Sequence, residues 1–454
     1  MATATKLGSA TEKLTSLIGD KTRYDIAHED LLATQIEAAD EIFQDRLSRI
    51  RLLQNRAESG SVAAIRSLED IVPVLFAHTT YKSYPETWLT EQRWDRLGKW
   101  LDTVSANRVA GVDLEGIGDF DQWLERLEAV GHFVSCSSGT TGKSAMMNAT
   151  RGDLQFGSHD TATSVAWTTR VEPSHDRRVF ALAPVARIPR NDAVKRALTG
   201  AYALPGVPLW DLPVPPITVG RITGMVALRK RIADGTAQPE DIARYEAESA
   251  SRQAAIDSAV VVAAEQMVAA RKDKMLIIGM WTALHKIAEL VRAMGYSAKD
   301  FSPDNMIYVG GGLKGATLPV NYREYIYETF NIQAQRIHNF YGMQELNTTF
   351  PKCSAGRYHS APWLIPLLLD DSGDNLIAPK KGEQEGRAAF FDLSLEGRWN
   401  GVISGDKIVI DYGPCTCGAH SPSIADTVTR YSDLAGGDKI SCSGTIDAYV
   451  RGVA

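Results

Sequence analysis

Residue types that bind phosphate are concentrated in one stretch of the chain, Ser137-Ser138-Gly139-Thr140-Thr141-Gly142-Lys143-Ser144. It follows an apolar run, His132-Phe133-Val134, that predicts a short strand. Glycines let the backbone turn tightly and expose its N–H groups, and hydroxyl groups add donors for an anionic oxygen. The stretch therefore predicts a phosphate-binding loop.

The loop differs from the P-loop of nucleotide triphosphatases. That motif places a glycine five residues before the Gly of Gly-Lys-Ser, and this chain has Ser137 there. A surface turn rich in Ser, Thr and Gly is the alternative interpretation of the same residues.

Two close pairs of side chains have the chemistry of metal ligands. Cys353 and His359 are separated by five residues, and Cys415 and Cys417 by one. Three thiolates and one imidazole make a closed tetrahedral zinc site. The alternative is a set of separate buried cysteines, which are common in protein cores.

The composition sets the class of protein. Among 454 residues, 44% are hydrophobic and 23% charged, which is ordinary for a soluble globular protein. The formal charge of -6 and the absence of a long basic run argue against nucleic acid binding. We find no apolar stretch of bilayer-spanning length and no apolar signal peptide, so we expect a cytoplasmic protein. Five cysteines fit reduced thiols or a metal site better than a disulfide framework.

Apolar runs and helical periodicities alternate along the chain. The segments expected to be strands or extended are 71–76, 132–134, 179–184, 274–280 and 306–312. The segments expected to be helical are 23–57, 88–100, 239–272 and 281–294. Segments 78–85 and 204–216 are expected to be loops. The alternation predicts a layered α/β architecture.

Four motifs together resemble the adenylate-forming superfamily, the acyl-CoA synthetases and their relatives. They are the Ser137–Ser144 stretch, Tyr341-Gly342-Met343-Gln344-Glu345, Ser404-Gly405-Asp406 and Arg430-Tyr431-Ser432-Asp433. The second is similar to the family's Tyr-Gly-Met-Thr-Glu, with Gln344 in place of Thr. The third resembles its Thr-Gly-Asp. The fourth resembles the Arg-x-Asp-Asp hinge, with Ser432 in place of the first Asp.

The resemblance implies ATP-dependent activation of a small carboxylic acid. The phosphate loop would hold the β- and γ-phosphates, Glu345 would help bind Mg²⁺, and Asp406 would accept hydrogen bonds from the ribose hydroxyls. Arg430 would reach ribose or phosphate, and Tyr341 would stack near adenine. The residues expected to bind the nucleotide are Ser137, Ser138, Gly139, Thr140, Thr141, Gly142, Gly311, Gly312, Tyr341, Gly342, Asp406 and Arg430. The residues expected to be catalytic are Lys143, Glu345 and Cys442.

Two branches of the superfamily supply closer resemblances. Phenylacetate-CoA ligase-like enzymes carry a Cys…His pair and a Cys-x-Cys-Gly at matching places. A zinc bound by Cys353, His359, Cys415 and Cys417 would be structural, because four protein ligands leave no open position for chemistry. The run 310–315 resembles a Gly-Gly-Gly-Trp-Lys segment of the acyl-protein synthetases of bacterial bioluminescence. We expect the acyl pocket to lie against 310–314 and Phe340.

Cys442 lies 12 residues before the last residue, Ala454. The acyl-protein synthetases transfer their acyl group to a cysteine close to the C-terminus, so the resemblance makes Cys442 a candidate acyl acceptor. Lys439 would lower the pKa of its thiol if it points the same way. A small buried cysteine in a strand is the alternative.

The expected fold class is α/β, the multi-layered large N-terminal domain of adenylate-forming enzymes, with the small C-terminal domain absent or vestigial. We expect 1–130 to form the N-terminal helical part, 131–425 the adenylation core with phosphate loop and zinc site, and 426–454 the hinge and a short tail.

The sequence leaves the function open among three alternatives. The first is an enzyme that passes an acyl group to a thiol, either its own or that of a carrier protein, a reductase or CoA. The second is a truncated acyl-CoA ligase. The third is a non-catalytic, zinc-stabilised nucleotide-binding protein. It does not name the acid. The oligomeric state is open too, with a homodimer among the options.

Overall fold

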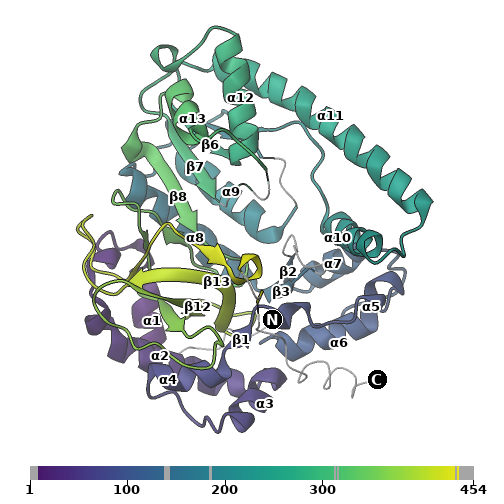
Figure 1. Cartoon of the computed structure of the whole chain (residues 1–454), viewed down its shortest axis with the longest axis vertical. Helices are drawn as coiled ribbons and strands as arrows, with labels where there is room; N and C mark the ends of the chain where they lie inside the picture. Colours follow the sequence, from purple (N-terminus) through teal and green to yellow (C-terminus); the bar gives the residue numbers. More distant parts are fainter. Residues whose placement is uncertain are drawn as a thin grey trace. The chain divides into compact units, whose positions relative to one another are not determined.

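The computed structural model describes residues 9–136, 144–183, 187–310, 313, 316–434 and 437–438 (Figure 1). The chain divides into two compact units, Met1–Gly157 with Met343–Ala454, and Ser158–Gly342. Sheets and helices occur in both units, which confirms the predicted mixed α/β class. The three segments expected from the motifs stay a prediction, since these units are defined by compactness alone.

A parallel sheet forms the centre of the second unit. Its strands run in the order β5-β4-β6-β7-β8, and each neighbouring pair is parallel. Their bounds are β4 Arg178–Ala181, β5 Trp210–Asp211, β6 Met275–Gly279, β7 Met306–Gly310 and β8 Ile337–Tyr341. The helices are α8 Arg151–Thr169, which begins in the first unit, α9 Pro189–Tyr202, α10 Val219–Ala233, α11 Pro239–Ala269, α12 Trp281–Ala293 and α13 Tyr322–Phe330.

Alternate residues of these strands enter two separate cores. Ile277 and Ile307 pack with residues of α11, α12 and α13 on one face of the sheet. Leu276 and Met306 pack with residues of α8 and α9 on the other face. Side chains of a strand alternate between faces, so a continuous apolar run is what a strand covered on both sides requires.

An antiparallel sheet forms the centre of the first unit. The strands run β10-β14-β13-β12-β11, and β1 and β15 also pair with β13. Their bounds are β10 Tyr358–His359, β11 Leu364–Leu369, β12 Gln384–Asp392, β13 Gly401–Asp411, β14 Ser423–Ile424, β1 Phe76–Ala77 and β15 Thr429–Arg430. β1 is parallel to β13, and the other pairings are antiparallel. The short strand β9 is Phe350–Pro351.

Helices and one hairpin complete the first unit. The helices are α1 Ser9–Thr15, α2 His28–Leu47, α3 Arg51–Ser59, α4 Leu68–Ile71, α5 Thr87–Thr90, α6 Trp94–Val104 and α7 Phe120–Ala129. The hairpin pairs β2 Phe133–Cys136 with β3 Met146–Ala149. The buried Trp399 ring packs against Phe43 of α2, Phe76 of β1 and Phe391 of β12, so one aromatic cluster ties helices to the sheet.

Several local predictions were wrong in detail. The helix expected over 88–100 is broken between α5 and α6, and the loop expected over 204–216 contains β5. The helix expected over 23–57 is broken between α2 and α3, where Ile50 is extended and fully buried. Arg49 donates hydrogen bonds to Asp45 and to the carbonyl oxygen of Ala106, which fixes the chain at this bend. The extended segment expected over 71–76 is mostly a 3-10 turn, Val72–Val74, followed by β1. Pro73 has no N–H to offer a strand ladder.

No helix in the described part of the chain combines the length and the apolar character needed to cross a membrane.

Candidate active site and candidate metal centre

Asp406 and Arg430 face each other across two strands of the first unit. Asp406 lies in β13 and is the register partner of Arg430 in β15. Arg430 Nε is 3.8 Å from Asp406 Oδ1. The Arg430 side chain is 60% exposed and the Asp406 side chain 15%, so Arg430 is open to a ligand and the ion pair contributes little to stability. The structure thus brings together two residues for which the resemblance predicts nucleotide binding, Asp406 to the ribose and Arg430 to ribose or phosphate.

The backbone of Glu345 is held by a buried arginine, Arg398, that lies outside the four sequence motifs. Arg398 donates hydrogen bonds to the carbonyl oxygens of Gln344 and Glu345, at 3.1 and 3.0 Å. It donates a third, of 3.0 Å, to the carbonyl oxygen of Asn148 in β3. Arg398 is 3% exposed. One guanidinium therefore fixes Glu345 relative to the hairpin whose connection is the predicted phosphate loop.

The segment after Glu345 is fixed by two buried carboxylates. Asp392 accepts hydrogen bonds from the backbone N–H groups of Asn347 and Thr348. Asp153 accepts from the Asn347 side chain and from the backbone N–H of Gly397. Buried carboxylates need hydrogen-bond donors in place of water, and here the donors belong to the chain itself. These hydrogen bonds therefore hold the residues after Glu345 in a defined position.

We expect Arg398→Lys to destabilise the fold. A lysine ammonium cannot reproduce the planar fork that reaches three carbonyl oxygens, and hydrogen bonds to charged groups contribute about 1.5–3 kcal/mol each. Urea unfolding should show a loss of about 2–3 kcal/mol. Arg126→Lys is the control, because the Arg126–Asp113 pair is exposed and should cost less than about 1 kcal/mol. Equal losses in the two variants would contradict the role of Arg398.

His78 lies against the Ser404-Gly405-Asp406 motif. β1 runs parallel to β13, and the backbone N–H of His78 donates to the carbonyl oxygen of Ile403 at 2.9 Å. A Cβ on Gly405 would lie 3.4 Å from His78 Nε2 and 3.2 Å from Asp438 Oδ2, which is closer than most Cβ contacts. Glycine at this position therefore allows both side chains to approach the motif. The sequence pattern predicts only a polar loop over 78–85, because parallel pairing with β13 leaves no local signal.

Residues beyond β15 are anchored to the same sheet. The fully buried Arg387 forms an ion pair with Asp438, Nη1 to Oδ1 3.1 Å, and its guanidinium lies 3.7 Å from the centre of the Tyr431 ring. Tyr431 donates its hydroxyl to Asp371 at 2.7 Å. His78 Nε2 is 3.7 Å from Asp438. Tyr431 therefore anchors the hinge-like motif, while Arg430 beside it stays exposed.

Two of the residues predicted to bind the nucleotide, Tyr341 and Gly342, lie at the carboxyl end of the parallel sheet in the second unit. Tyr341 ends β8 and Gly342 follows it. Gly310 ends β7 and pairs with Phe340, whose ring occupies the space that a Cβ at Gly310 would need. Ligands of parallel sheets bind at this end of the strands.

The four predicted metal ligands lie together in the first unit. The donor atoms of Cys353, His359, Cys415 and Cys417 are all within 4.8 Å of one another. Cys353 Sγ is 3.9 Å from Cys415 Sγ, and Cys417 Sγ is 3.4 Å from His359 Nε2. Tetrahedral zinc with Zn–S of about 2.3 Å separates its sulfurs by about 3.8 Å, so the donor set fits zinc.

Two similar turns bring the thiols to this point. The Gly356 N–H donates to the carbonyl oxygen of Cys353, and the Gly418 N–H to that of Cys415, both at 3.0 Å. Both glycines have positive φ, +80° and +98°, which other residues adopt only with strain. The Cys-x-x-Gly spacing at both places is the local sequence signal for this geometry.

Electrostatics at the cluster also suit a cation. His359 Nδ1 lies 3.0 Å from Ser421 Oγ, which leaves Nε2 directed at the thiols. Burial lowers the pKa of His359 to about 4, so the ring is neutral at pH 7, the form that a metal binds. Burial and the neighbouring thiols raise the pKa of Cys417 to about 12, and a bound cation would supply the charge that favours its thiolate.

Several predicted residues lie outside the described part of the chain. They are Ser137, Ser138, Gly139, Thr140, Thr141, Gly142, Lys143, Gly311, Gly312 and Cys442. Their expected roles stay predictions.

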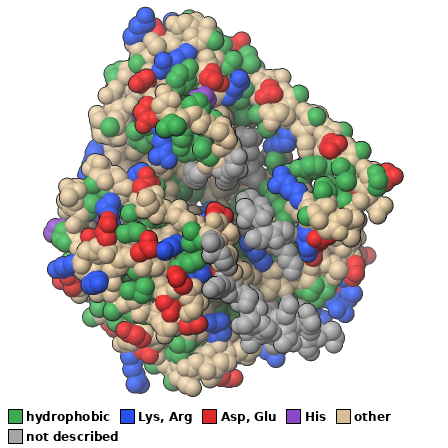
Figure 2. Space-filling model, in the orientation of Figure 1, with side chains coloured by type: hydrophobic (Ala, Val, Ile, Leu, Met, Phe, Trp, Pro, Cys, Tyr) green, Lys and Arg blue, Asp and Glu red, His purple; other side chains and the backbone are tan. Residues whose placement is uncertain are grey.

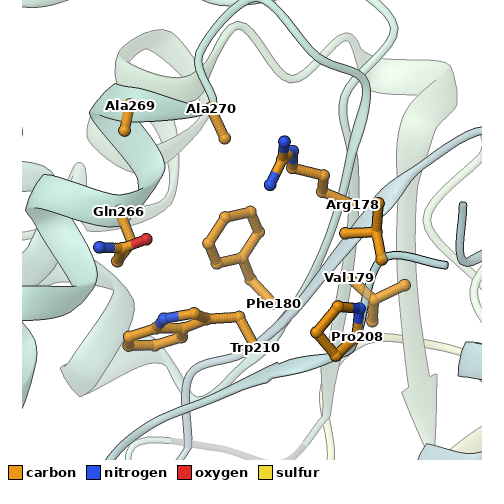
Figure 3. A pocket seen from close by; sticks show the side chains of 9 residues that line it. Arg178, Val179, Phe180, Pro208, Trp210, Gln266, Ala269 and Ala270 are labelled. Atoms are coloured by element: carbon orange, nitrogen blue, oxygen red, sulfur yellow. The ribbon is translucent and has the colours of Figure 1, made fainter.

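A surface pocket of about 210 Å³ lies elsewhere in the second unit (Figure 3). Its walls include Arg178 at the start of β4, Trp210 at the start of β5, and Ala269 at the end of α11. The pocket is thus at the amino end of the parallel strands and contains none of the predicted site residues. On the face drawn in Figure 2, the coloured Lys and Arg side chains are interspersed with Asp and Glu side chains.

No protein-family model matches the chain, and no curated protein matches it. Among solved structures, the chain is similar to 2-hydroxyisobutyryl-CoA ligase in complex with 2-HIB-AMP and CoA in the thioesterification state, with 14% identity and a TM-score of 0.52 over 90% of this chain and 70% of that chain. A structure of the same ligase in the postadenylation state with 2-HIB-AMP gives 11% identity and a TM-score of 0.49 over 90% and 69%. The first similarity shows that the chain has the fold of an acyl-CoA ligase.

Proposed function

We propose that this protein is an ATP-dependent acid–thiol ligase that activates a carboxylic acid as its acyl-adenylate. The observation that carries the proposal is the Asp406–Arg430 pair on an acyl-CoA ligase fold, on the same compact unit as Glu345. A carboxylate next to an exposed guanidinium offers acceptors for ribose hydroxyls and a donor for phosphate.

The proposed reaction has two steps. A carboxylate oxygen of the acid attacks the α-phosphorus of ATP, the bond from that phosphorus to the bridging oxygen breaks, and pyrophosphate leaves with the electron pair. A thiolate then attacks the acyl carbon, and AMP leaves. The protein has little covalent work in the first step, so positioning and charge neutralisation are what its residues supply.

Each residue of the site has a task in this proposal. Asp406 orients the ribose, Arg430 contacts ribose or phosphate, and Tyr341 stacks near adenine. Glu345 is half-buried on a backbone fixed by Arg398, which suits a carboxylate that holds Mg²⁺. When bound, Mg²⁺ neutralises phosphate charge.

The zinc in this proposal is structural. Cys353, His359, Cys415 and Cys417 fill a tetrahedral shell and leave no open position for a substrate. Metal binding would join two segments that are far apart in the sequence, so its contribution is to stability.

The acid-dependent exchange of labelled pyrophosphate into ATP tests the proposal. A panel of short hydroxy, aromatic and fatty acids should contain at least one that supports exchange in the presence of Mg²⁺. Folded protein that binds ATP but supports no exchange with any acid in the panel would favour a zinc-stabilised nucleotide-binding protein instead.

For the acyl acceptor we propose a thiol, and Cys442 is one candidate. Incubation with ATP and a labelled acid should give a hydroxylamine-sensitive acyl-protein that is absent in Cys442→Ser. Cys136→Ala is the control, because Cys136 is buried in β2 and burial raises the pKa of its thiol, so its removal should leave labelling intact. Adenylate formation without any acyl-protein would move the acceptor to an outside thiol, with CoA, which the similar ligase binds, as the first choice.

A further inference from the structure

One segment of the first unit, 76–84, contacts both ends of the proposed nucleotide site. At its start, Phe76 and Ala77 pair in parallel with Val402 and Ile403, the two residues before the Ser404-Gly405-Asp406 motif. At its end, the Tyr84 hydroxyl donates to the carbonyl oxygen of Ser144 at 2.8 Å. Ser144 is the last residue of the predicted phosphate-binding stretch, Ser137–Ser144. The segment therefore bridges the ribose motif and the end of the phosphate loop.

This bridge has a fixed conformation. Tyr81 is fully buried, and the Tyr84 ring packs edge-on against Trp100 of α6 with centroids 5.0 Å apart. Ser83 Oγ accepts a hydrogen bond from the indole of Trp100 at 2.9 Å. Residues that flank Lys82 on both sides are thus anchored, so the lysine projects from a defined place in the 3-10 turn Thr80–Lys82.

Lys82 lies within electrostatic reach of the other charged residues of the site. Burial lowers the pKa of Lys82, the charge of Glu345 raises it, and the charge of Arg430 lowers it. Glu345 also acts on the neighbouring Tyr81. The Lys82 side chain is half-buried, so its ammonium is partly removed from water while it keeps access to a ligand. An ammonium in such a place attracts an anionic oxygen more strongly than an exposed one does.

The groups of ATP follow a fixed covalent order: adenine, ribose, then the α-, β- and γ-phosphates. This order determines which group would lie next to Lys82. If Asp406 holds the ribose and the loop before Ser144 holds the β- and γ-phosphates, the α-phosphate lies between them. The bridging segment 76–84 spans that same interval, and Lys82 is its cation. Resting on the function proposed above, we propose that Lys82 contacts the α-phosphate of ATP and of the adenylate, and stabilises the charge that develops there when the acid attacks.

AMP and adenosine differ in that phosphate alone, so they are the probes. Calorimetric titration should show that Lys82→Met weakens AMP binding at least tenfold, the effect of one charge-assisted hydrogen bond, and leaves adenosine binding unchanged. The acid-dependent exchange should lose about 10²-fold in kcat, as when one preorganised donor to a transition state is removed. Lys82→Arg keeps the charge and should recover most of the AMP affinity.

Lys99→Met is the matched control, because Lys99 is an exposed lysine on α6 of the same unit. It should change neither binding nor exchange. If Lys82→Met unfolds, the affinities of Lys82→Gln and Lys82→Arg for AMP and for adenosine are compared instead. Weaker AMP binding in Lys82→Gln than in Lys82→Arg, with equal adenosine binding, would support the role of Lys82.

The outcomes separate the two proposals. Suppose that the wild-type protein shows exchange and binds AMP, and that folded Lys82→Met binds AMP equally well. This result overturns the role of Lys82 and leaves the proposed function standing. Equal losses for AMP and adenosine in Lys82→Met also overturn it, since they indicate a purely structural lysine. Wild-type protein with neither exchange nor AMP binding overturns the proposed function, and the α-phosphate role with it.

Discussion

Replacing Asp406 with alanine should lower the acid-dependent pyrophosphate exchange by about 10²–10³-fold. The carboxylate is the proposed acceptor for the ribose hydroxyls, and misplacing the nucleotide displaces the α-phosphate from the attacking oxygen. The free energy of unfolding should change by less than about 1 kcal/mol, because Arg430, the ion-pair partner of Asp406, is exposed. Exchange assays and urea unfolding on the same preparation measure both effects.

A matched control lies on the neighbouring strand. Glu385 of β12 is 57% exposed and pairs with Lys407, Oε1 to Nζ 2.5 Å, so Glu385→Ala removes an acid of the same sheet from a place without a proposed ligand. It should keep full exchange. If folded Asp406→Ala also keeps full exchange, the assignment of Asp406 to the ribose is wrong.

Removal of zinc should produce the largest loss of stability. We expect one zinc per chain, and at a free zinc concentration 1,000 times the Kd the metal contributes about 4 kcal/mol. A chelator that strips the metal should therefore lower the melting temperature clearly, and added zinc should restore it. His359→Ala should lower the melting temperature in a similar way, because it leaves three thiols crowded together without the imidazole.

Controls separate the metal from the thiols. Mg²⁺ should not restore the melting temperature after chelation, since thiolate ligands favour zinc. Cys136→Ala, outside the cluster, should bind zinc as the wild type does. Carefully purified, folded protein without any metal in elemental analysis would contradict the zinc site.

Local patterns were enough to predict much of the second unit. Met275–Gly279, Trp281–Ala293 and Met306–Gly310 fall within or close to the segments expected from the sequence. A strand covered on both faces must be continuously apolar, and a long helix needs a sustained helical periodicity of apolar residues. Both patterns can be recognised from residues that are close together in the sequence. The break at Ile50 was missed because long-range bonds of Arg49 hold it.

The sequence alone pointed to the residue types and spacings of the candidate site: the two cysteine-containing pairs, Glu345, and the motifs around Asp406 and Arg430. The tertiary structure alone decided which of them meet. It places Asp406 opposite Arg430, gathers the four candidate metal-ligand atoms within 4.8 Å, and brings His78 against Gly405. The buried contacts of Arg398 and the position of Lys82 also appear only there, because they depend on pairings between residues far apart in the chain, such as β1 with β13, and such pairings leave no periodic trace in the sequence.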